Sequence, residues 1–352
     1  MWVNYAILKQ NPESQNNDHP MAKQKKILVG PIFQNTAFES EARGTGLERL
    51  RQLAQVEPYS QREMTARHAQ DVVAVVADSV LFTPEFYTAA DELRIIARWG
   101  VGFDKVNVDE ATEHGVIVTV TPVHMDTVAE YTITQWLATL KRVYTLNQAS
   151  HQGDFTILCT FEAQGSTLGL YGFGRIGQQV ALRAKPLLGE QGRLLVYDIR
   201  NDIQELAARF GAEAVDSPAV LFEECDTVSL HVAGDETIVG YDLLATMKPH
   251  ASLINPSRGN LVNDEAANQA IREERLFYYV VDDPVSGPRV IHRDHPRIIC
   301  TNHNGGITVE STIRLDLMAF SQVTDALQGR LPQHVLNQSV LEHPRVKSYL
   351  NI

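Results

Sequence analysis

Residues 166–198 read STLGLYGFGRIGQQVALRAKPLLGEQGRLLVYD. Residues 167–171 form a short apolar run between turn residues, which indicates a buried strand. This strand runs directly into GFGRIG at residues 172–177, a GxGxxG sequence. Apolar residues then recur at helical spacing, and a second apolar run at residues 194–197 ends in Asp198. The order predicted is strand, glycine turn, helix, strand and acid.

Each glycine of this turn has its own physical role. Gly172 permits the tight turn, Gly174 lets the backbone approach a pyrophosphate, and Gly177 allows the helix to pack closely on the strand. The helix then presents backbone N–H groups to the phosphates. Asp198 lies roughly 20 residues further on, the spacing of an acid that binds the adenosine ribose hydroxyls. We therefore predict a dinucleotide site that favours NAD, because Asp198 would repel a 2′-phosphate; Arg200 could weaken that preference.

The composition is that of a globular protein of two domains. Among 352 residues, 31 are Lys or Arg and 43 are Asp or Glu, a net charge of −12 that argues against a nucleic-acid surface. The three cysteines show no CxxC spacing, so we expect a reduced, cytoplasmic protein without a disulfide framework or a metal site. No apolar run is long enough to cross a membrane. Residues 1–24 are interpreted as an N-terminal extension.

Strand and helix patterns alternate along the whole chain, which predicts an α/β fold with two doubly wound parallel sheets. About six strands are expected from residue 167 onward. Residues 128–144 are interpreted as one interdomain helix, and residues 309–327 as a helix that could return to the first domain. The strands expected in the first sheet are residues 27–29, 72–77, 93–98 and 116–120.

The chain resembles the NAD-dependent D-isomer-specific 2-hydroxyacid dehydrogenases, the family of D-3-phosphoglycerate dehydrogenase and the glyoxylate/hydroxypyruvate reductases. The resemblance covers about residues 25–337. It implies a flavodoxin-like substrate domain (25–127 with 309–352), a Rossmann NAD domain (128–308), NAD in the cleft between them, and a homodimer. The segments that carry it are WGVGFDKVNV (99–108), TVAE (127–130), LGLYGFGRIG (168–177), VSLHV (228–232), MKPHASLINPSRGNLVNDEA (247–266) and NHNGG (302–306).

The resemblance assigns the chemistry to two side chains. Reduction of a 2-oxo acid needs a cation that binds and polarises the substrate and an acid that protonates the developing alkoxide. Arg258 matches the family's substrate-binding arginine, whose planar fork suits a carboxylate and a carbonyl together. His303 matches the catalytic acid/base. The implied function is hydride transfer between NAD(H) and a small polar D-2-hydroxy or 2-oxo acid.

Further residues are matched to binding roles. The N–H groups of Val101 and Gly102 match the loop that receives the substrate carboxylate. Asp78 and Ser79 occupy a loop that lacks the arginine expected for a phosphorylated substrate, so substrate hydroxyl groups are favoured. Arg98 and His124 are interpreted equally as carboxylate contacts or as packing residues. The predicted cofactor contacts are Gly172, Gly174, Arg175, Ile176, Gly177, Asp198, Ala233, Thr237, Pro256, Ser257, Asp282 and Gly305, with Asp282 on the nicotinamide carboxamide.

One departure concerns the third catalytic residue of the family, a glutamate that pairs with the histidine. It is expected about five residues after Asp282, where this chain has Gly287. Three interpretations stay open. In the first, Asp283 replaces the glutamate from a shifted loop. In the second, His303 works unpaired and the pH profile of reduction is shifted toward acid. In the third, the chain is an NAD-binding regulatory protein with weak or no turnover.

Overall fold

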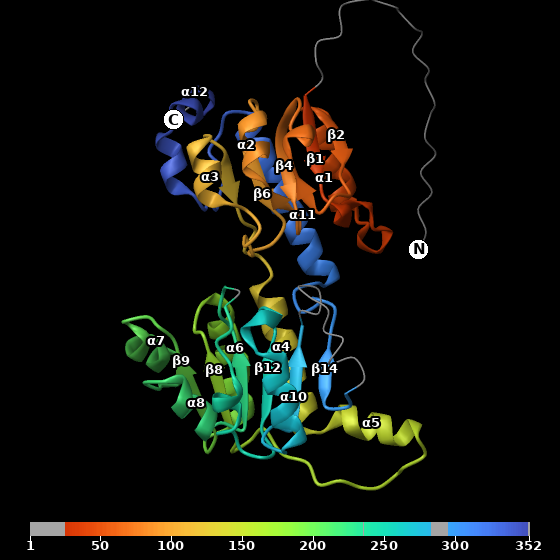
Figure 1. Ribbon diagram of the computed structural model, residues 1–352, viewed down its shortest axis with the longest axis vertical. Coiled ribbons are helices and arrows are strands. Elements are labelled where there is room, and N and C mark those ends of the chain that lie inside the picture. The colour runs from red at the N-terminus through yellow and green to blue at the C-terminus, as the bar shows by residue number, and fades with distance from the viewer. Residues whose placement is uncertain (1–24, 235, 283–294, 351–352) are drawn as a thin grey trace, which may run out of the picture.

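The computed structural model describes residues 25–234, 236–282 and 295–350. Figure 1 shows two α/β domains stacked along the long axis. The chain passes between them at the start of α4 (Met125–Leu140) and again before α11 (Val309–Leu327). The first domain is built on a five-stranded sheet and the second on a seven-stranded sheet. The proposed N-terminal extension lies outside the described residues. Within the described part of the chain, no helix is both long and apolar enough to span a bilayer.

The first sheet is parallel, with strand order β2-β1-β4-β6-β7. This is the flavodoxin-like order 2-1-3-4-5. All six residues of β4 are buried, as expected for a central parallel strand that is covered on both faces. The strands are β1 (Lys26–Val29), β2 (Gln55–Pro58), β4 (Val72–Ala77), β6 (Ile95–Arg98) and β7 (Ile117–Thr119); the helices of this part are α1 (Glu41–Arg51), α2 (Pro84–Ala89) and α3 (Val108–Glu113).

The second sheet is also parallel, with order β10-β9-β8-β11-β12-β13-β14. Its first six strands follow the Rossmann order 3-2-1-4-5-6. The count of about six strands missed β10, because a two-residue strand with an exposed glutamate leaves no apolar run. The strands are β8 (Thr167–Tyr171), β9 (Arg193–Tyr197), β10 (Glu213–Ala214), β11 (Thr227–Leu230), β12 (Ser252–Asn255), β13 (Tyr278–Val281) and β14 (Ile298–Cys300); the helices are α6 (Arg175–Leu188), α7 (Ile203–Arg209), α8 (Pro218–Glu224), α9 (Tyr241–Leu244) and α10 (Asp264–Arg272).

The predicted helix at residues 128–144 is wrong in its last turn. The helix α4 (Met125–Leu140) ends earlier, and α5 (Val143–His151) begins a second helix. Between them Arg142 adopts a left-handed φ of +50°. Its guanidinium lies 4.2 Å from the centre of the Phe277 ring, a cation–π contact that accompanies the change of direction.

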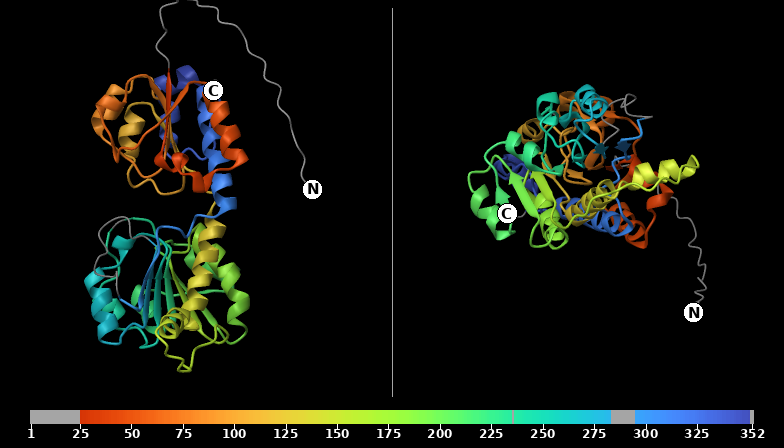
Figure 2. Two further views of the ribbon diagram at one scale, coloured as in Figure 1. Left: turned by 90° about the vertical axis from the view of Figure 1, so that its right-hand side faces the viewer. Right: turned by 90° about the horizontal axis from the view of Figure 1, so that it is seen from below.

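The C-terminal part of the chain packs on the first sheet. The helix α11 (Val309–Leu327) contributes Leu315, Ala319 and Phe320 to the same core as β1, β4 and β6. Beyond it, the buried amide of Asn337 accepts from the N–H of Val118 and donates to the carbonyl of Val116. The last helix is α12 (Pro344–Tyr349). Figure 2 shows the blue α11 and α12 against the orange elements of the first domain.

Candidate active site

The predicted site residues follow the carboxyl ends of strands in both sheets. In open α/β sheets, ligands bind at this edge, where the strand order reverses. The order reverses between β1 and β4 in the first sheet and between β8 and β11 in the second. The loop after β6 and the loop after β12 meet across the domain boundary, through the pair described next.

Arg258 binds a carboxylate of the other domain. Its Nε and Nη2 donate to one oxygen of Asp104 over 3.2 and 3.0 Å, and its Nη1 donates to the carbonyl of Ser257 over 2.9 Å. A Cβ atom on Gly102 would lie 2.2 Å from Nη2. The structure therefore places Arg258 directly over Gly102. Asp104 was not predicted as a site residue, although it is an acid inside the WGVGFD turn.

Side chains hold the turn after β6 in place. Arg98 donates to the carbonyl of Gly102 over 2.7 Å and to that of Ala77 over 2.6 Å. The N–H of Gly100, which has φ +131°, donates to Thr121 Oγ1 over 2.5 Å. Of the two interpretations of Arg98, these contacts favour a packing role that fixes the loop.

A buried acid supports the same turn from below. Asp316 on α11 accepts from Trp99 Nε1 over 2.7 Å and from Arg43 Nε and Nη2 over 2.7 and 3.0 Å. The side chains of Asp316 and Arg43 are 0% and 4% exposed, so this ion pair is fully inside the protein. Sequence reasoning missed it, although an acid on the apolar face of a predicted helix is a readable signal.

The pair Asp78 and Ser79 lies at the reversal point of the first sheet. The carboxylate of Asp78 accepts from the hydroxyl of Tyr59 over 2.9 Å and from the N–H of Ile32 over 3.4 Å. Burial, with Asp78 beside it, raises the pKa of Tyr59. Ser79 is exposed. Asp78 thus holds the loop after β1, and its contact with substrate hydroxyls stays a prediction.

The glycine turn after β8 fits a dinucleotide. Gly172 has φ +96°, and a Cβ there would lie 2.4 Å from the carbonyl oxygen of His231. A Cβ on Gly177 would lie 2.5 Å from the carbonyl oxygen of Gly172, whereas one on Gly174 would meet no atom within 4 Å. Gly174 therefore leaves open space before the N-terminus of α6, where a pyrophosphate would receive backbone N–H groups. Arg175 and Ile176 form the first turn of that helix.

The remaining cofactor candidates lie in the loops after β11 and β12. Ser257 donates to the carbonyl of Leu230 over 2.8 Å, and Thr237 donates to that of Asn260 over 2.9 Å. Pro256 precedes Ser257, and Ala233 is exposed near the start of the loop after β11. Among the described residues, His231 Nε2 is buried without a hydrogen-bond partner, and burial lowers the pKa of His231 to about 3.

Asp282 shapes the loop that carries His303. Its carboxylate accepts from Thr301 Oγ1 over 2.5 Å and from the N–H groups of Asn304 and Gly305 over 2.9 and 2.5 Å. His303 is exposed and has a left-handed φ of +57°, which is uncommon for a residue other than glycine. A carboxylate has about four acceptor positions, so a nicotinamide carboxamide remains compatible with these contacts.

His124 lies close to His303. A Cβ atom on Gly306, in the same loop as His303, would lie 3.0 Å from His124 Cδ2. Burial first, and then the charges of His303, Arg175 and Arg314, lower the pKa of His124 to about 4. His124 is therefore neutral near pH 7. The structure brings the start of α6, the loop of His303 and the start of α4 close together.

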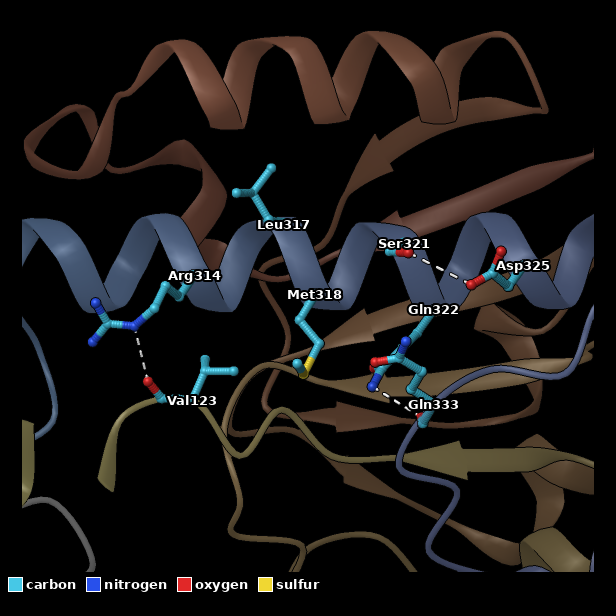
Figure 3. A pocket seen from close by; sticks show the side chains of 8 residues that line it. All are labelled: Val123, Arg314, Leu317, Met318, Ser321, Gln322, Asp325 and Gln333. Carbon is cyan, nitrogen blue, oxygen red and sulfur yellow. Dashed lines mark hydrogen bonds between the residues drawn. The ribbon is translucent and has the colours of Figure 1, made fainter. Parts of the chain in front are cut away.

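Gly287, at the position of the family's glutamate, and Asp283, its possible substitute, lie outside the described residues. Within the residues described, no group of three or more His, Cys, Asp or Glu side chains is arranged to hold a metal. A separate groove of about 320 Å³ runs beside α11 (Figure 3), and none of the predicted site residues lines it. Its lining residues are Val123, Arg314, Leu317, Met318, Ser321, Gln322, Asp325 and Gln333.

Comparison with known proteins agrees with this arrangement. Residues 133–305 match the family model of the D-isomer specific 2-hydroxyacid dehydrogenase, NAD binding domain. A glyoxylate reductase of Korarchaeum cryptofilum is 32% identical over 287 residues, which are 77% of this chain and 83% of the relative. A D-3-phosphoglycerate dehydrogenase of Methanocaldococcus jannaschii is 29% identical over 89% of this chain and 59% of the relative.

Solved structures share the whole fold. The TT0316 protein of Thermus thermophilus superposes with a TM-score of 0.73 at 27% identity, covering 88% of this chain and 99% of that one. An NAD-complexed D-isomer specific 2-hydroxyacid dehydrogenase of Lactobacillus delbrueckii superposes with a TM-score of 0.67 at 22% identity, covering 89% of this chain and 100% of that one. The chain therefore belongs to the D-isomer specific 2-hydroxyacid dehydrogenases, and its cofactor is NAD.

Proposed function

We propose that the chain interconverts a small polar 2-oxo acid and the corresponding D-2-hydroxy acid, with Arg258 binding the substrate and His303 transferring the proton. The observation that carries this proposal is the position of the Arg258 guanidinium over Gly102. Nη2 and the backbone of the 99–104 turn converge on one point between the domains. That point suits a carboxylate beside a carbonyl, because a guanidinium fork binds two oxygens in one plane.

The donors of Arg258 support the same role. The bonds to Asp104 and Ser257 use three of its five N–H groups among the described residues. One hydrogen on each of the two terminal nitrogens is left for substrate oxygens. Asp104 therefore orients the guanidinium without occupying the edge that would bind substrate.

We assign the proton transfer to His303, whose exposed side chain lies in the loop after β14. The glycine turn after β8 would hold NADH, which would supply the hydride for the carbonyl carbon. The imidazole of His303 gives a proton to the carbonyl oxygen, which becomes the hydroxyl, and takes it back in the reverse direction. Asp282 holds the loop that positions this imidazole, through Asn304 and Gly305.

The substrate is proposed to be small and unphosphorylated. The loop after β4 offers Asp78 and Ser79, which suit hydroxyl groups and would repel a phosphate. Relatives named glyoxylate reductase support a short 2-oxo acid. Glyoxylate and hydroxypyruvate are the first compounds to test.

The test is NADH oxidation with a panel of 2-oxo acids by the wild type and three variants. Arg258→Lys and Gly102→Ala should each raise KM about 10- to 100-fold, because a charge-assisted contact is lost or displaced. His303→Gln should lower kcat about 10²- to 10⁴-fold. Gly102→Ala should still fold, because its new Cβ would meet only the flexible end of the Arg258 side chain. Full activity of His303→Gln would refute the proposed acid/base.

The second candidate is an NAD-binding regulatory protein, and Gly287 in place of the family's glutamate favours it. Tight NADH binding with no turnover of any 2-oxo acid between pH 5 and pH 9 would replace the first proposal with this one. Turnover with an acid-shifted optimum would instead support a dehydrogenase whose histidine works unpaired.

We further propose that the chain is a homodimer. The segment after α5 extends away from the second domain (Figure 1) and exposes large apolar side chains, with Phe155 79% and Ile157 96% accessible. Such a patch on a projecting arm favours association with a second copy. Sedimentation of the wild type should show a dimer and that of Phe155→Asp/Ile157→Asp a monomer; a wild-type monomer at micromolar concentration would refute the proposal.

A further inference from the structure

The loop after β9 contains an ion pair that the proposed catalytic steps do not use. Arg200 Nε donates to Asp202 Oδ1, and Nη2 donates to Oδ2, each over 2.8 Å. This is a two-point contact between a planar guanidinium and a carboxylate. Both side chains are about half exposed, at 44% and 52%. The pair lies between the end of β9 and the start of α7, four residues or fewer after Asp198; Figure 1 labels both elements.

Asp198 faces the glycine turn. Its Oδ2 accepts from the N–H of Phe173 over 2.6 Å, and its Oδ1 accepts from the N–H of Arg200 over 3.1 Å. Ile199, between Asp198 and Arg200, is a large apolar side chain that is 88% exposed. An acid and an open apolar surface next to the phosphate turn suit the ribose and adenine of a dinucleotide.

We infer that Asp202 determines cofactor specificity: by binding Arg200, it keeps a cation away from the ribose 2′ position and holds the site selective for NAD(H) over NADP(H). The inference rests on the proposed contact of Asp198 with the adenosine ribose. A 2′-phosphate needs a cation near Asp198, and Arg200 is only two residues away.

The charges support this assignment. Asp198, Arg200 and Asp202 together carry one net negative charge, which disfavours a dianionic phosphate and leaves ribose hydroxyls able to donate to Asp198. Without Asp202 the net charge is zero, and the Nε and Nη2 edge of Arg200 becomes available. Arginine is the side chain best suited to a phosphate at such an edge.

The ordinary structural role of Asp202 does not account for its geometry. Asp202 occupies the N-cap position of α7, where an aspartate commonly accepts from a backbone N–H of the first turn. Here its side chain makes no capping hydrogen bond and is turned to Arg200 instead. Removing the carboxylate therefore costs the helix no cap. A substitution can thus test specificity without unfolding α7.

The experiment measures dissociation constants for NADH and NADPH, and for 5′-AMP and 2′,5′-ADP as probes of the adenosine end. Asp202→Ser removes the carboxylate and keeps a residue that caps helices well. It should lower the dissociation constants of 2′,5′-ADP and NADPH about 10-fold, as expected for one freed charge-assisted contact. The dissociation constant of NADH should change less than about 2-fold. The gain should shrink at high salt.

Two further variants separate a specific effect from a general change in charge. Glu205→Gln removes one negative charge from the first turn of the same helix, so it is the matched control and should leave the NADPH to NADH ratio unchanged. The double variant Arg200→Gln/Asp202→Ser should not bind NADPH more tightly than the wild type does, because the guanidinium freed by Asp202→Ser is absent. If Asp202→Ser changes the ratio no more than Glu205→Gln does, Asp202 has no role in specificity.

The same titrations distinguish the failure of this inference from that of the proposed ribose contact. Asp198→Asn should weaken the binding of both NADH and 5′-AMP. If Asp198→Asn binds both as the wild type does, the proposed ribose contact is wrong and the inference falls with it. If Asp198→Asn weakens both while Asp202→Ser leaves the ratio unchanged, only the inference is overturned.

Discussion

The two glycine turns of the site, one after β6 and one after β8, keep their shapes by opposite means. The turn after β8 depends on missing side chains, since a Cβ on Gly172 or Gly177 would approach a backbone oxygen to 2.4 or 2.5 Å. The turn after β6 depends on side chains that reach it from elsewhere. Arg98 and Thr121 bond its backbone, and Asp316 holds Trp99.

This difference matches what each turn is proposed to bind. A pyrophosphate is recognised by backbone N–H groups, so its turn needs close approach and glycine supplies that. A small 2-oxo acid offers few atoms, so its turn must place one guanidinium and a few backbone groups accurately. Accurate placement comes from packed and hydrogen-bonded side chains. The two turns should therefore fail differently when they are mutated.

The largest effect is expected from Asp316→Asn, which breaks the support of the turn after β6. It leaves the buried guanidinium of Arg43 without its counter-charge, so the free energy of unfolding should fall by about 3–5 kcal/mol. Urea denaturation measures this. Glu48→Gln, which removes the exposed partner of Arg51, is the control and should cost under about 1 kcal/mol. A loss below about 1 kcal/mol for Asp316→Asn would contradict this account.

The next effect is expected in the turn after β8. Gly172→Ala forces a Cβ against the carbonyl of His231 at φ +96°, so it should destabilise the fold by about 1–3 kcal/mol and weaken NADH binding. Gly174→Ala has space for its Cβ and should leave the melting temperature nearly unchanged while it weakens NADH binding. Equal melting temperatures for the two variants would show that the turn does not depend on the missing Cβ of Gly172.

A smaller effect is expected from Trp99→Phe. It removes one hydrogen bond to Asp316 and keeps Arg43 in place, so stability should fall by about 1 kcal/mol. Because Trp99 precedes the turn under Arg258, KM for the 2-oxo acid should rise several-fold more than KM for NADH. Steady-state kinetics with each substrate varied in turn measures this. Equal changes in both constants would show that Trp99 supports the fold without positioning the turn.

The smallest effect is expected in the pH dependence of stability, through His231 beside the turn after β8. Burial lowers the pKa of His231, beside the second turn, to about 3, below the ordinary value of about 6.5. The unfolded chain therefore binds a proton on His231 below about pH 6.5 and the native protein does not, so stability falls progressively between about pH 6.5 and pH 3. His231→Gln should lessen the loss between pH 7.5 and pH 5, as followed by the urea midpoint. An unchanged pH dependence would show that His231 is not held neutral.

Strong periodic patterns predicted several elements with their bounds. The strand at residues 167–171, the strand at 72–77 and the helix at 309–327 agree with β8, β4 and α11. The strand β2 went unpredicted because Gln55–Pro58 carries polar residues and a proline, which an edge strand tolerates. The end of α4 went unpredicted because the apolar spacing continues across Arg142.

The sequence by itself determined the nucleotide turn, the parallel α/β sheets and the family, because these depend on residues close together in the chain and on their periodicity. Tertiary structure alone decided what surrounds the proposed catalytic groups. Arg258 meets Asp104 across 154 positions, and Asp316 meets Trp99 across 217. Asp282 bonds Asn304 and Gly305, beside His303, across 22 and 23 positions. No local pattern encodes such pairs, since each carboxylate could bind several cations until packing brings one within hydrogen-bonding distance.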